Sequence, residues 1–395
     1  MLNFDEAFEH VQRVAPRLTS ELVTLEQAHG RVLSEPLHAT SPLPAFDYSA
    51  MDGYAVLSTA FFGEPPFTFS IDGESRTGRP APRLGAGSVC RIFTGAQLPD
   101  GADAVVMQED VIVNERTARF DRRPDVGQHV RRAGEDIARG ALALDAGTRL
   151  GAYQLGLVAA LDRGEVRVAK RPRVSILSTG DELRKPGSGE RPASIPESNS
   201  FVIAALARAV GATVTTLAAT SDTLDDTRAS IAAALATSDV LVTVGGVSVG
   251  DYDVVRPALE AEGVVLELYK VAMKPGKPLT LGRRGETLVL GLPGNPTSAQ
   301  VTFALFGVPL LRTMQGERTL RSPRRFRLGA PIRQKPGRRG FYTATLDGGV
   351  VMPTTGQASG STVNLAHAQA LVIVPEDSSG YDAGETADVL LLSEL

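Results

Sequence analysis

The sequence is poor in the side chains that carry nucleophilic and zinc chemistry. Its 395 residues include one cysteine, Cys90, five scattered histidines and no tryptophan. A zinc site needs a close set of cysteine and histidine ligands, and no such set occurs. A P-loop motif is also missing. The serine of Gly246-Val-Ser-Val-Gly250 has no histidine near it in sequence, so we do not expect an acyl-enzyme mechanism.

Strong charge of either sign and long apolar runs are missing as well. The formal net charge is −4 and no lysine-rich block occurs, which argues against a nucleic-acid partner. No uncharged apolar run approaches the roughly 18 residues that would span a bilayer, so we expect no membrane partner. The first residues lack the basic and apolar regions of a signal peptide, and a single cysteine excludes an intramolecular disulfide. We therefore expect a soluble, cytoplasmic protein.

Length and pattern predict several domains. A chain of 395 residues that is 43% hydrophobic is too long for one ordinary core. Four patterns follow one another along the chain. They are helical spacing, then short strands broken by glycine and proline, then alternating strands and helices, and finally short strands again. We predict a discontinuous helical, elongated domain, a small β-rich domain, an α/β domain and a C-terminal β-barrel-like domain, with the boundaries 1–45 plus 145–171, 46–144, 172–317 and 318–395.

The α/β domain is predicted from alternation. The expected strands are 174–178, 213–217, 240–244 and 287–290, and the expected helices are 201–210, 224–236, 254–262 and 297–314. Spacings of this kind require crossover connections, which give a largely parallel, doubly wound sheet covered by helices.

One stretch of this domain concentrates unusual residues. After Asp239, the mainly apolar run 240–244 ends at Gly245-Gly246, and Asp251 and Asp253 follow. Four loops are expected to share the order apolar strand, glycine with polar residues, helix: 178–182, 245–253, 274–278 and 291–298. Because the carboxyl ends of parallel strands meet at one edge, these loops should converge there and bind an anion. The alternative is that each glycine only makes a turn.

Charged residues in these loops suggest ligands. Asp251 and Asp253 flank Tyr252, as a divalent cation held through oxygen would require, although an aspartate here could equally cap the next helix. Only six of the 41 basic residues are lysines, and two of them, Lys274 and Lys277, flank Pro275-Gly276. An oxyanion or phosphate is their natural partner, and a solvated surface turn is the alternative.

Other polar residues are given plainer interpretations. Asp181 and Glu182 form a second acidic pair. Arg338 and Arg339 in the last domain are each expected to be solvated. Ser359 lies on a glycine-rich loop, where turn formation is the simpler reading.

Seven motifs, in one order from about residue 4 to the end, resemble a known family. They are Phe46-Asp-Tyr-Ser-Ala-Met-Asp-Gly-Tyr-Ala55, Arg91-Ile-Phe-Thr-Gly-Ala96, Arg132-Ala-Gly-Glu-Asp-Ile137, Ser178-Thr-Gly-Asp-Glu-Leu183, Gly245-Gly-Val-Ser-Val-Gly250 with Asp253, Lys274-Pro-Gly-Lys-Pro278 and Gly291-Leu-Pro-Gly-Asn-Pro296. The chain looks like the molybdopterin molybdenumtransferases (MoeA type, which includes the gephyrin E domain). It departs from the family at Glu197-Ser-Asn199, where Asp-Ser-Asn is usual.

The resemblance implies a function. It suggests a transferase of molybdenum cofactor biosynthesis that converts adenylylated molybdopterin and molybdate, with Mg²⁺, into molybdenum cofactor and AMP. It also implies an elongated four-domain homodimer with a cleft shared between subunits. The molybdopterin adenylyltransferase and molybdoenzyme targets are the protein partners it suggests.

The resemblance also assigns residues. It implies that Asp52 and Thr94 enter from the partner subunit, and that Asp251, Lys274 and Lys277 are the other catalytic residues. Molybdate would be held by Lys274, Lys277, Arg338 and Ser359, and the metal by Asp251, Asp253 and Glu182. The pterin-phosphate and nucleotide region would comprise Thr179, Gly180, Asp181, Glu182, Ser198, Asn199, Gly245, Gly246, Ser248, Pro293 and Asn295.

Two other functions remain open from the sequence. The α/β domain alone resembles a molybdopterin adenylyltransferase, but that reading leaves the other three domains unexplained. A cofactor-binding scaffold without turnover would be marked by loss of the acidic and lysine residues, and both sets are present. Transfer of an oxyanion with loss of AMP needs charge neutralisation and no protein nucleophile, which agrees with the scarcity of cysteine and histidine.

Overall fold

A computed structural model describes residues 1–217, 223–246, 254–318, 323–358 and 360–394. The chain forms two compact units. Unit 1 comprises Met1–Glu35, Ala146–Gly151 and Val166–Leu395, and unit 2 comprises Pro36–Asp145 and Ala152–Glu165. The four domain boundaries drawn from the sequence stay a prediction. Among the described residues, no helix combines the length and apolarity needed to cross a membrane.

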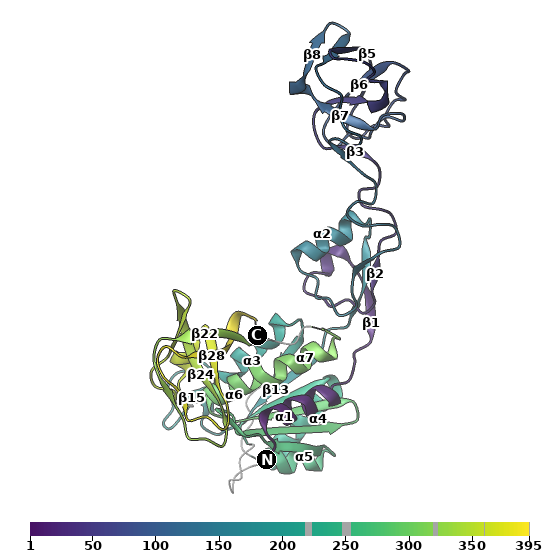
Figure 1. The fold of residues 1–395 in the computed structure, drawn as a ribbon. Helices are drawn as coiled ribbons and strands as arrows, with labels where there is room; N and C mark the ends of the chain where they lie inside the picture. The colour runs from purple at the N-terminus through teal and green to yellow at the C-terminus, as the bar shows by residue number, and fades with distance from the viewer. Residues whose placement is uncertain (218–222, 247–253, 319–322, 359, 395) are drawn as a thin grey trace. The chain divides into compact units, whose positions relative to one another are not determined.

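A six-stranded sheet forms the centre of unit 1 (Figure 1). Its order is β16 (Thr213–Thr216), β13 (Arg173–Ser178), β17 (Val240–Val244), β21 (Thr287–Leu292), β20 (Pro278–Arg284) and β18 (Val265–Lys270). The first four strands are parallel, β20 is antiparallel to β21, and β18 is antiparallel to β20. The largely parallel α/β sheet predicted from the sequence is confirmed.

Helices cover both faces of this sheet because its strands are apolar on both sides. Ile176, Val242 and Leu290 enter one core, while the alternate residues Leu177 and Leu241 enter the other. The first core is covered by α1 (Phe4–Val14), α3 (Asn199–Ala209), α6 (Pro296–Thr302), the π-helical η4 (Phe303–Gly307) and α7 (Val308–Met314), and the second by α4 (Leu224–Thr237) and α5 (Val255–Ala261). The doubly wound arrangement is therefore confirmed.

The C-terminal strands close into a small barrel. Each of β24 (Arg339–Asp347), β25 (Val350–Pro353), β22 (Arg324–Leu328), β28 (Thr386–Leu391) and β26 (Ala370–Val374) pairs with the next, and β26 pairs back to β24. The barrel is accompanied by β23 (Ile332–Arg333), β27 (Gly380–Tyr381), α8 (Thr362–His367) and η5 (Leu392–Glu394). This confirms the expected C-terminal β-barrel.

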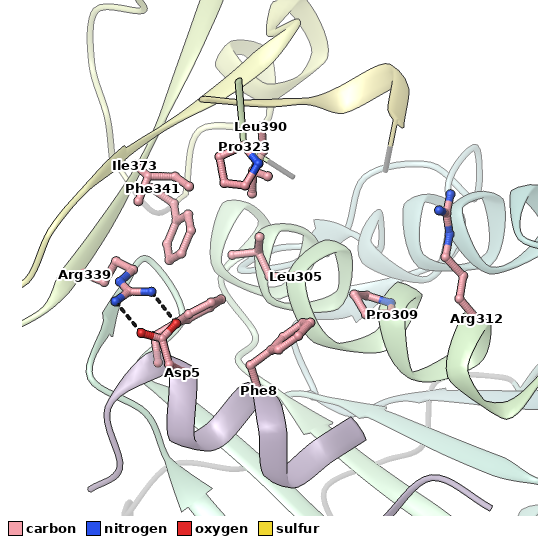
Figure 2. A pocket seen from close by; sticks show the side chains of 11 residues that line it. Asp5, Phe8, Leu305, Pro309, Arg312, Pro323, Arg339, Phe341, Ile373 and Leu390 are labelled. Carbon is pink, nitrogen blue, oxygen red and sulfur yellow. Dashed lines mark hydrogen bonds and ion pairs between the residues drawn. The ribbon is translucent and has the colours of Figure 1, made fainter. Parts of the chain in front are cut away.

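The barrel and the α/β sheet share one core. Phe341, Leu371 and Leu390 of the barrel are buried in the same cluster as η4 and α1. Phe4 of α1 contacts Phe341 with ring centroids 5.0 Å apart. Figure 2 shows the edge of this junction, a cavity of about 220 Å³ between α1, α7 and the barrel, with Arg339 bonded to Asp5 at one end.

One of the four expected strand–loop–helix units is wrong. The turn from Lys274 to Pro278 is followed by strand β20 and not by a helix. Because β20 runs antiparallel to β21, with Thr280 opposite Gly291, its first residue still lies at the edge where the parallel strands end. The lysines therefore reach the expected edge by another route.

The opening of the chain is only partly helical. Helix α1 begins with a capping box, in which the Asn3 side chain accepts from Glu6 N and the Glu6 carboxylate accepts from Asn3 N. After it come β1 (Ser20–Thr24), which pairs with β12 (Glu165–Ala169), and the 3₁₀ turn η1 (Leu25–Gln27).

Unit 2 is built around a second six-stranded sheet. The order is β7 (Ala104–Met107), β4 (Gly53–Val56), β6 (Ser88–Ile92), β5 (Phe67–Ser75), β9 (Thr117–Phe120) and β8 (Val111–Asn114). Phe61, Phe67 and Phe120 pack in its core. Unit 2 also contains β2 (Leu37–His38), β3 (Tyr48–Ser49), η2 (Ser58–Ala60), η3 (Gln108–Asp110), β10 (Val130–Arg131), β11 (Leu142–Leu144) and α2 (Ala152–Ala160). The short strands β14 (Leu183–Arg184) and β15 (Ile195–Pro196) belong to unit 1.

We expect the Cys90 thiol to be unreactive toward thiol reagents in the folded protein. The thiol lies on β6 with no exposed surface, and burial raises its pKa to about 11, so it stays protonated at neutral pH. We expect negligible reaction with a thiol-specific disulfide reagent in buffer and one equivalent in guanidinium chloride. Fast stoichiometric reaction of the native protein would contradict the described packing, and a Cys90→Ser variant supplies the blank.

Candidate functional site

The first candidate pocket lies at the carboxyl ends of β13 and β17. We call it the strand-end pocket. Its volume is about 270 Å³ and it is lined by Ser178, Thr179, Gly180, Glu182, Leu183, Ile195, Pro196, Glu197, Ser198, Asn199, Val244, Gly245, Gly246, Gly294 and Pro296. Seven of the residues predicted to bind pterin phosphate and nucleotide are in this set: Thr179, Gly180, Glu182, Ser198, Asn199, Gly245 and Gly246.

The Thr179 hydroxyl is a free polar group in this pocket. Thr179 is 5% exposed, and its Oγ1 has no hydrogen-bond partner among the described residues. It lies beside the Gly245-Gly246 turn, within about 3.3 Å of where a Cβ would stand at either glycine. A buried hydroxyl without a partner is costly, so this atom is suited to a ligand oxygen or an ordered water.

Glu197 is a buried structural acid at the start of α3. Its carboxylate accepts hydrogen bonds from Ser178 Oγ at 3.2 Å and from Ser200 N at 2.8 Å, and also from the Ser200 hydroxyl. The residue is 9% exposed. Because a carboxylate is stabilised at a helix N-terminus, the glutamate connects the end of β13 to the first turn of α3. The extra methylene relative to the family's usual aspartate still permits this bridge.

Glu182 is the exposed acid among the described residues that line the strand-end pocket, whereas Glu197 is buried. The Glu182 carboxylate lies directly over Gly180, within 2.8 Å of an ideal Cβ there. Asp251, Asp253 and Ser248, the other predicted metal and phosphate residues of the neighbouring loop, lie outside the described residues. In the part of the chain that is described, no three acidic, histidine or cysteine side chains group closely enough to hold a metal ion.

The second candidate pocket contains the two lysines, and we call it the lysine pocket. It has a volume of about 300 Å³ and is lined by Lys274, Pro275, Gly276, Lys277, Pro278, Thr297, Ser298, Arg338, Phe341, Tyr342 and Gln357. Lys274, Lys277 and Arg338 were predicted to hold one ligand, and the structure brings them together. Ser359, predicted to join them, lies outside the described residues.

The lysine pocket is electrostatically one-sided. Three cationic side chains line it, and no carboxylate is among the described lining residues. The Tyr342 ring lies under Lys274, with the ammonium 5.9 Å from the ring centroid. Gly276 is required by close packing, because a Cβ there would stand 2.0 Å from the Thr302 hydroxyl. A compact oxyanion matches this set of donors.

The two pockets adjoin at the first turn of α6. Pro296 lines the strand-end pocket, and the next residues, Thr297 and Ser298, line the lysine pocket. Consecutive residues of one helix turn thus line both pockets, as binding of one extended ligand with several anionic groups would require. The predicted residues Asp181, Pro293 and Asn295 are sequence neighbours of the lining residues but do not themselves line either pocket.

In unit 2, Asp52 and Thr94 contact each other. The Thr94 backbone N–H and hydroxyl both donate to the same oxygen, Asp52 Oδ1, at 2.7 and 2.8 Å. These bonds, first the backbone and then the hydroxyl, lower the pKa of Asp52, and the charge of Arg91 adds to the effect. The carboxylate therefore stays ionised at neutral pH and is suited to accept hydrogen bonds or bind a cation, not to donate a proton.

The sequence assigned no individual binding role to several lining residues. Ser178, Gly294, Thr297 and Ser298 lie in two of the four loops expected to converge, and Glu197 was noted only as a departure from the family pattern. Tyr342 and Gln357 were missed altogether. Thr297 and Ser298 follow Gly291-Leu-Pro-Gly-Asn-Pro296 directly, so that motif was a usable signal. Tyr342 and Gln357 come from the barrel, and nothing local in sequence marks them as neighbours of the lysines.

Comparison with known families defines the class of protein. Residues 2–161 match the model "MoeA N-terminal region (domain I and II)", residues 175–313 match "Probable molybdopterin binding domain", and residues 325–392 match "MoeA C-terminal region (domain IV)". The chain is thus a multidomain protein whose α/β domain matches the molybdopterin-binding type.

Full-length relatives narrow this class. The chain is 34% identical to the molybdopterin molybdenumtransferase of Haemophilus influenzae, with 98% of each chain covered, and 38% identical to molybdopterin molybdenumtransferase 2 of Mycobacterium tuberculosis, with 93% and 94% covered. It is also similar to the crystal structure of the MoeA molybdopterin biosynthesis protein from Pyrococcus horikoshii, with a TM-score of 0.86, 30% identity and 99% of each chain covered. The chain belongs to the molybdopterin molybdenumtransferase family, as the motifs predicted.

The Gly245-Gly246 turn generates a stability prediction. Gly246 has φ +62°, and a Cβ there would lie 2.2 Å from Val255 Cγ2, which is buried on α5. We expect Gly246→Ala to lower the free energy of unfolding by about 3 kcal/mol, from left-handed strain plus overpacking. Gly285, with φ +58° and open space around it, is the matched control, and Gly285→Ala should cost only the strain of about 1 kcal/mol. Equal losses in denaturant titrations would refute the close contact with Val255.

Proposed function

We propose that this chain inserts molybdenum into adenylylated molybdopterin, taking molybdate as the second substrate and releasing AMP. The observation that carries the proposal is the lysine pocket, which joins three cations without a carboxylate among the described lining residues and adjoins the strand-end pocket. The names of the full-length relatives, which are transferases, support it.

The two pockets divide the substrates between them. The strand-end pocket offers the unpartnered Thr179 hydroxyl to the pterin phosphate and nucleotide, beside the close-approach wall of Gly245 and Gly246. Lys274, Lys277 and Arg338 hold molybdate next to it as fixed donors. Preorganised positive charge stabilises the negative charge that moves between the oxyanion and the phosphoanhydride, so no protein nucleophile is needed.

Magnesium is the implied metal ion. Glu182 at the rim of the strand-end pocket has the oxygen ligands and exposure that suit Mg²⁺, and we assign it to the metal together with Asp251 and Asp253. When bound there, the ion would offset charge on the phosphoanhydride.

We further propose that the protein is a cytoplasmic homodimer with a shared site. Asp52 and Thr94 then reach the pockets of the partner subunit, where the ionised Asp52 carboxylate accepts hydrogen bonds from the substrate. The molybdopterin adenylyltransferase is the proposed donor of the substrate, and molybdoenzymes are the proposed acceptors of the product.

The decisive experiment follows AMP release. The purified protein is incubated with adenylylated molybdopterin and Mg²⁺, with and without molybdate, and AMP is measured. We expect release only with molybdate. Lys274→Ala should raise the KM for molybdate about tenfold or more, since one charge-assisted contact is lost, and should change the KM for the adenylylated pterin much less. Lys170→Ala, which removes an exposed lysine elsewhere in unit 1, is the control.

Other outcomes point to other functions. Release of AMP without molybdate counts against insertion. Consumption of ATP with free molybdopterin identifies an adenylyltransferase, and tight pterin binding without turnover identifies a scaffold. An equal rise in both KM values for Lys274→Ala contradicts the assignment of that lysine to molybdate.

Subunit mixing tests the shared site. Asp52→Ala and Lys277→Ala proteins are each expected to be inactive. After the two are unfolded and refolded together, half of the dimers are mixed and each mixed dimer has one intact site, so activity should recover to about a quarter of wild type. Recovery would be absent if both residues served a site within a single chain.

A further inference from the structure

The barrel supplies one wall of the lysine pocket, and this wall is hydrogen-bonded directly to the turn from Lys274 to Pro278, which we call the lysine turn. The two-residue strand β19 (Met273–Lys274) pairs in parallel with the start of β24, with Met273 opposite Arg339 and Lys274 opposite Gly340. Arg339 N donates to Ala272 O at 3.0 Å. The register of β24 against β19 therefore sets the distance between the lysines and the barrel side chains of the pocket.

Side chains at the start of β24 face two environments. Arg338, just before the strand, and Tyr342 line the lysine pocket, whereas Arg339 lines the cavity of Figure 2, which faces α1. In Figure 2 the Arg339 guanidinium points at Asp5 on α1. Arg339 thus lies next to an anion-binding residue in sequence but does not enter the anion pocket.

Arg339 is the centre of an ion triad. Its Nη1 and Nη2 donate to the two oxygens of Asp5 at 2.6 and 2.8 Å, and its Nε donates to Glu376 Oε2 at 3.0 Å. The guanidinium lies 5.2 Å from the centroid of the Phe4 ring. The Arg339 side chain is only 20% exposed. Bidentate pairing of this kind fixes orientation as well as charge.

Glu376 also binds the backbone of Gly337, the residue before Arg338. Its carbonyl accepts from Gly337 N at 2.6 Å, while its carboxylate accepts from Arg339. The hydrogen bond from Arg339 is the main reason that the pKa of Glu376 is lowered, so the carboxylate stays charged. Arg338 is therefore bracketed by two residues that are bonded to the same glutamate.

We propose that the Asp5–Arg339–Glu376 triad positions Arg338 against Lys274 and Lys277 and thereby sets the affinity of the lysine pocket for its oxyanion. The inference rests on the proposed function in taking molybdate as that oxyanion. Arg339 is a positioning residue: it holds β24 in register with β19 and touches no substrate. The triad also makes oxyanion affinity depend on α1, which lies more than 330 residues away in sequence.

Molybdate binding to the full-length protein tests the proposal without relying on turnover. Equilibrium dialysis gives the Kd for molybdate of wild type, Arg339→Gln and Glu376→Gln. We expect each variant to bind about tenfold more weakly, as small displacements of positioned groups do in other sites. Arg339→Lys keeps the charge but loses the planar fork, so it should fall between wild type and Arg339→Gln. Arg333→Gln, which breaks the exposed pair Arg333–Asp382 on the same barrel, is the matched control and should bind as wild type.

Steady-state kinetics separates positioning from general destabilisation. A positioning role raises the KM for molybdate in Arg339→Gln and leaves the KM for adenylylated molybdopterin within about twofold. Wild-type affinity for molybdate in both Arg339→Gln and Glu376→Gln overturns the inference, as does an equal rise in both KM values. Failure of wild type to bind molybdate overturns it too. Molybdate binding by wild type together with molybdate-independent AMP release would instead reject the proposed function and leave the triad's effect on binding in place.

Discussion

The lysine turn is held by two sheets at once, and the candidate site depends on this constraint. Lys274 is hydrogen-bonded into the barrel sheet through β19, and Pro278 begins β20 of the α/β sheet. Both ends of a five-residue turn are thus fixed by backbone pairing, so the backbone that carries the two lysines is positioned before any ligand arrives. A protein with net charge −4 obtains a positive pocket by placing three cations there, with no carboxylate among the lining residues that the structure describes.

Much of the α/β fold could be predicted from the sequence because its strands are buried on both faces. Runs such as Val240–Val244 are rich in apolar and β-branched residues, and this one ends at two glycines, which makes both its type and its end visible. The same reasoning placed Thr179 and Gly245 at one sheet edge, where the structure has them. The lysine pair was conspicuous because lysine is rare in this chain.

The remaining features of the fold and the site could not be predicted, because they depend on contacts between residues far apart in the sequence. Strand β18, Val265–Lys270, was missed because it mixes charged and apolar residues at the edge of the sheet. Strand β20, Pro278–Arg284, was missed because it begins with proline, contains Gly282 and ends in two arginines. Arg339 was expected to be solvated, and this was wrong: its partners Asp5 and Glu376 are 334 and 37 residues away. Glu197 looked like a functional departure, yet its bonds to Ser178 and Ser200 show a role in packing that only the three-dimensional neighbours reveal.

The way the two units interleave along the chain sets an order for folding. Helix α1 is made early, but the sheet that buries Ala7 and Val11 begins only at Arg173. Unit 2 closes its own core with residues from Pro36 to Asp145, so it can fold during synthesis while α1 waits for its partners. The apolar face of α1 is therefore exposed for the longest time of any core element in unit 1. That interval is when the nascent chain most needs protection from aggregation.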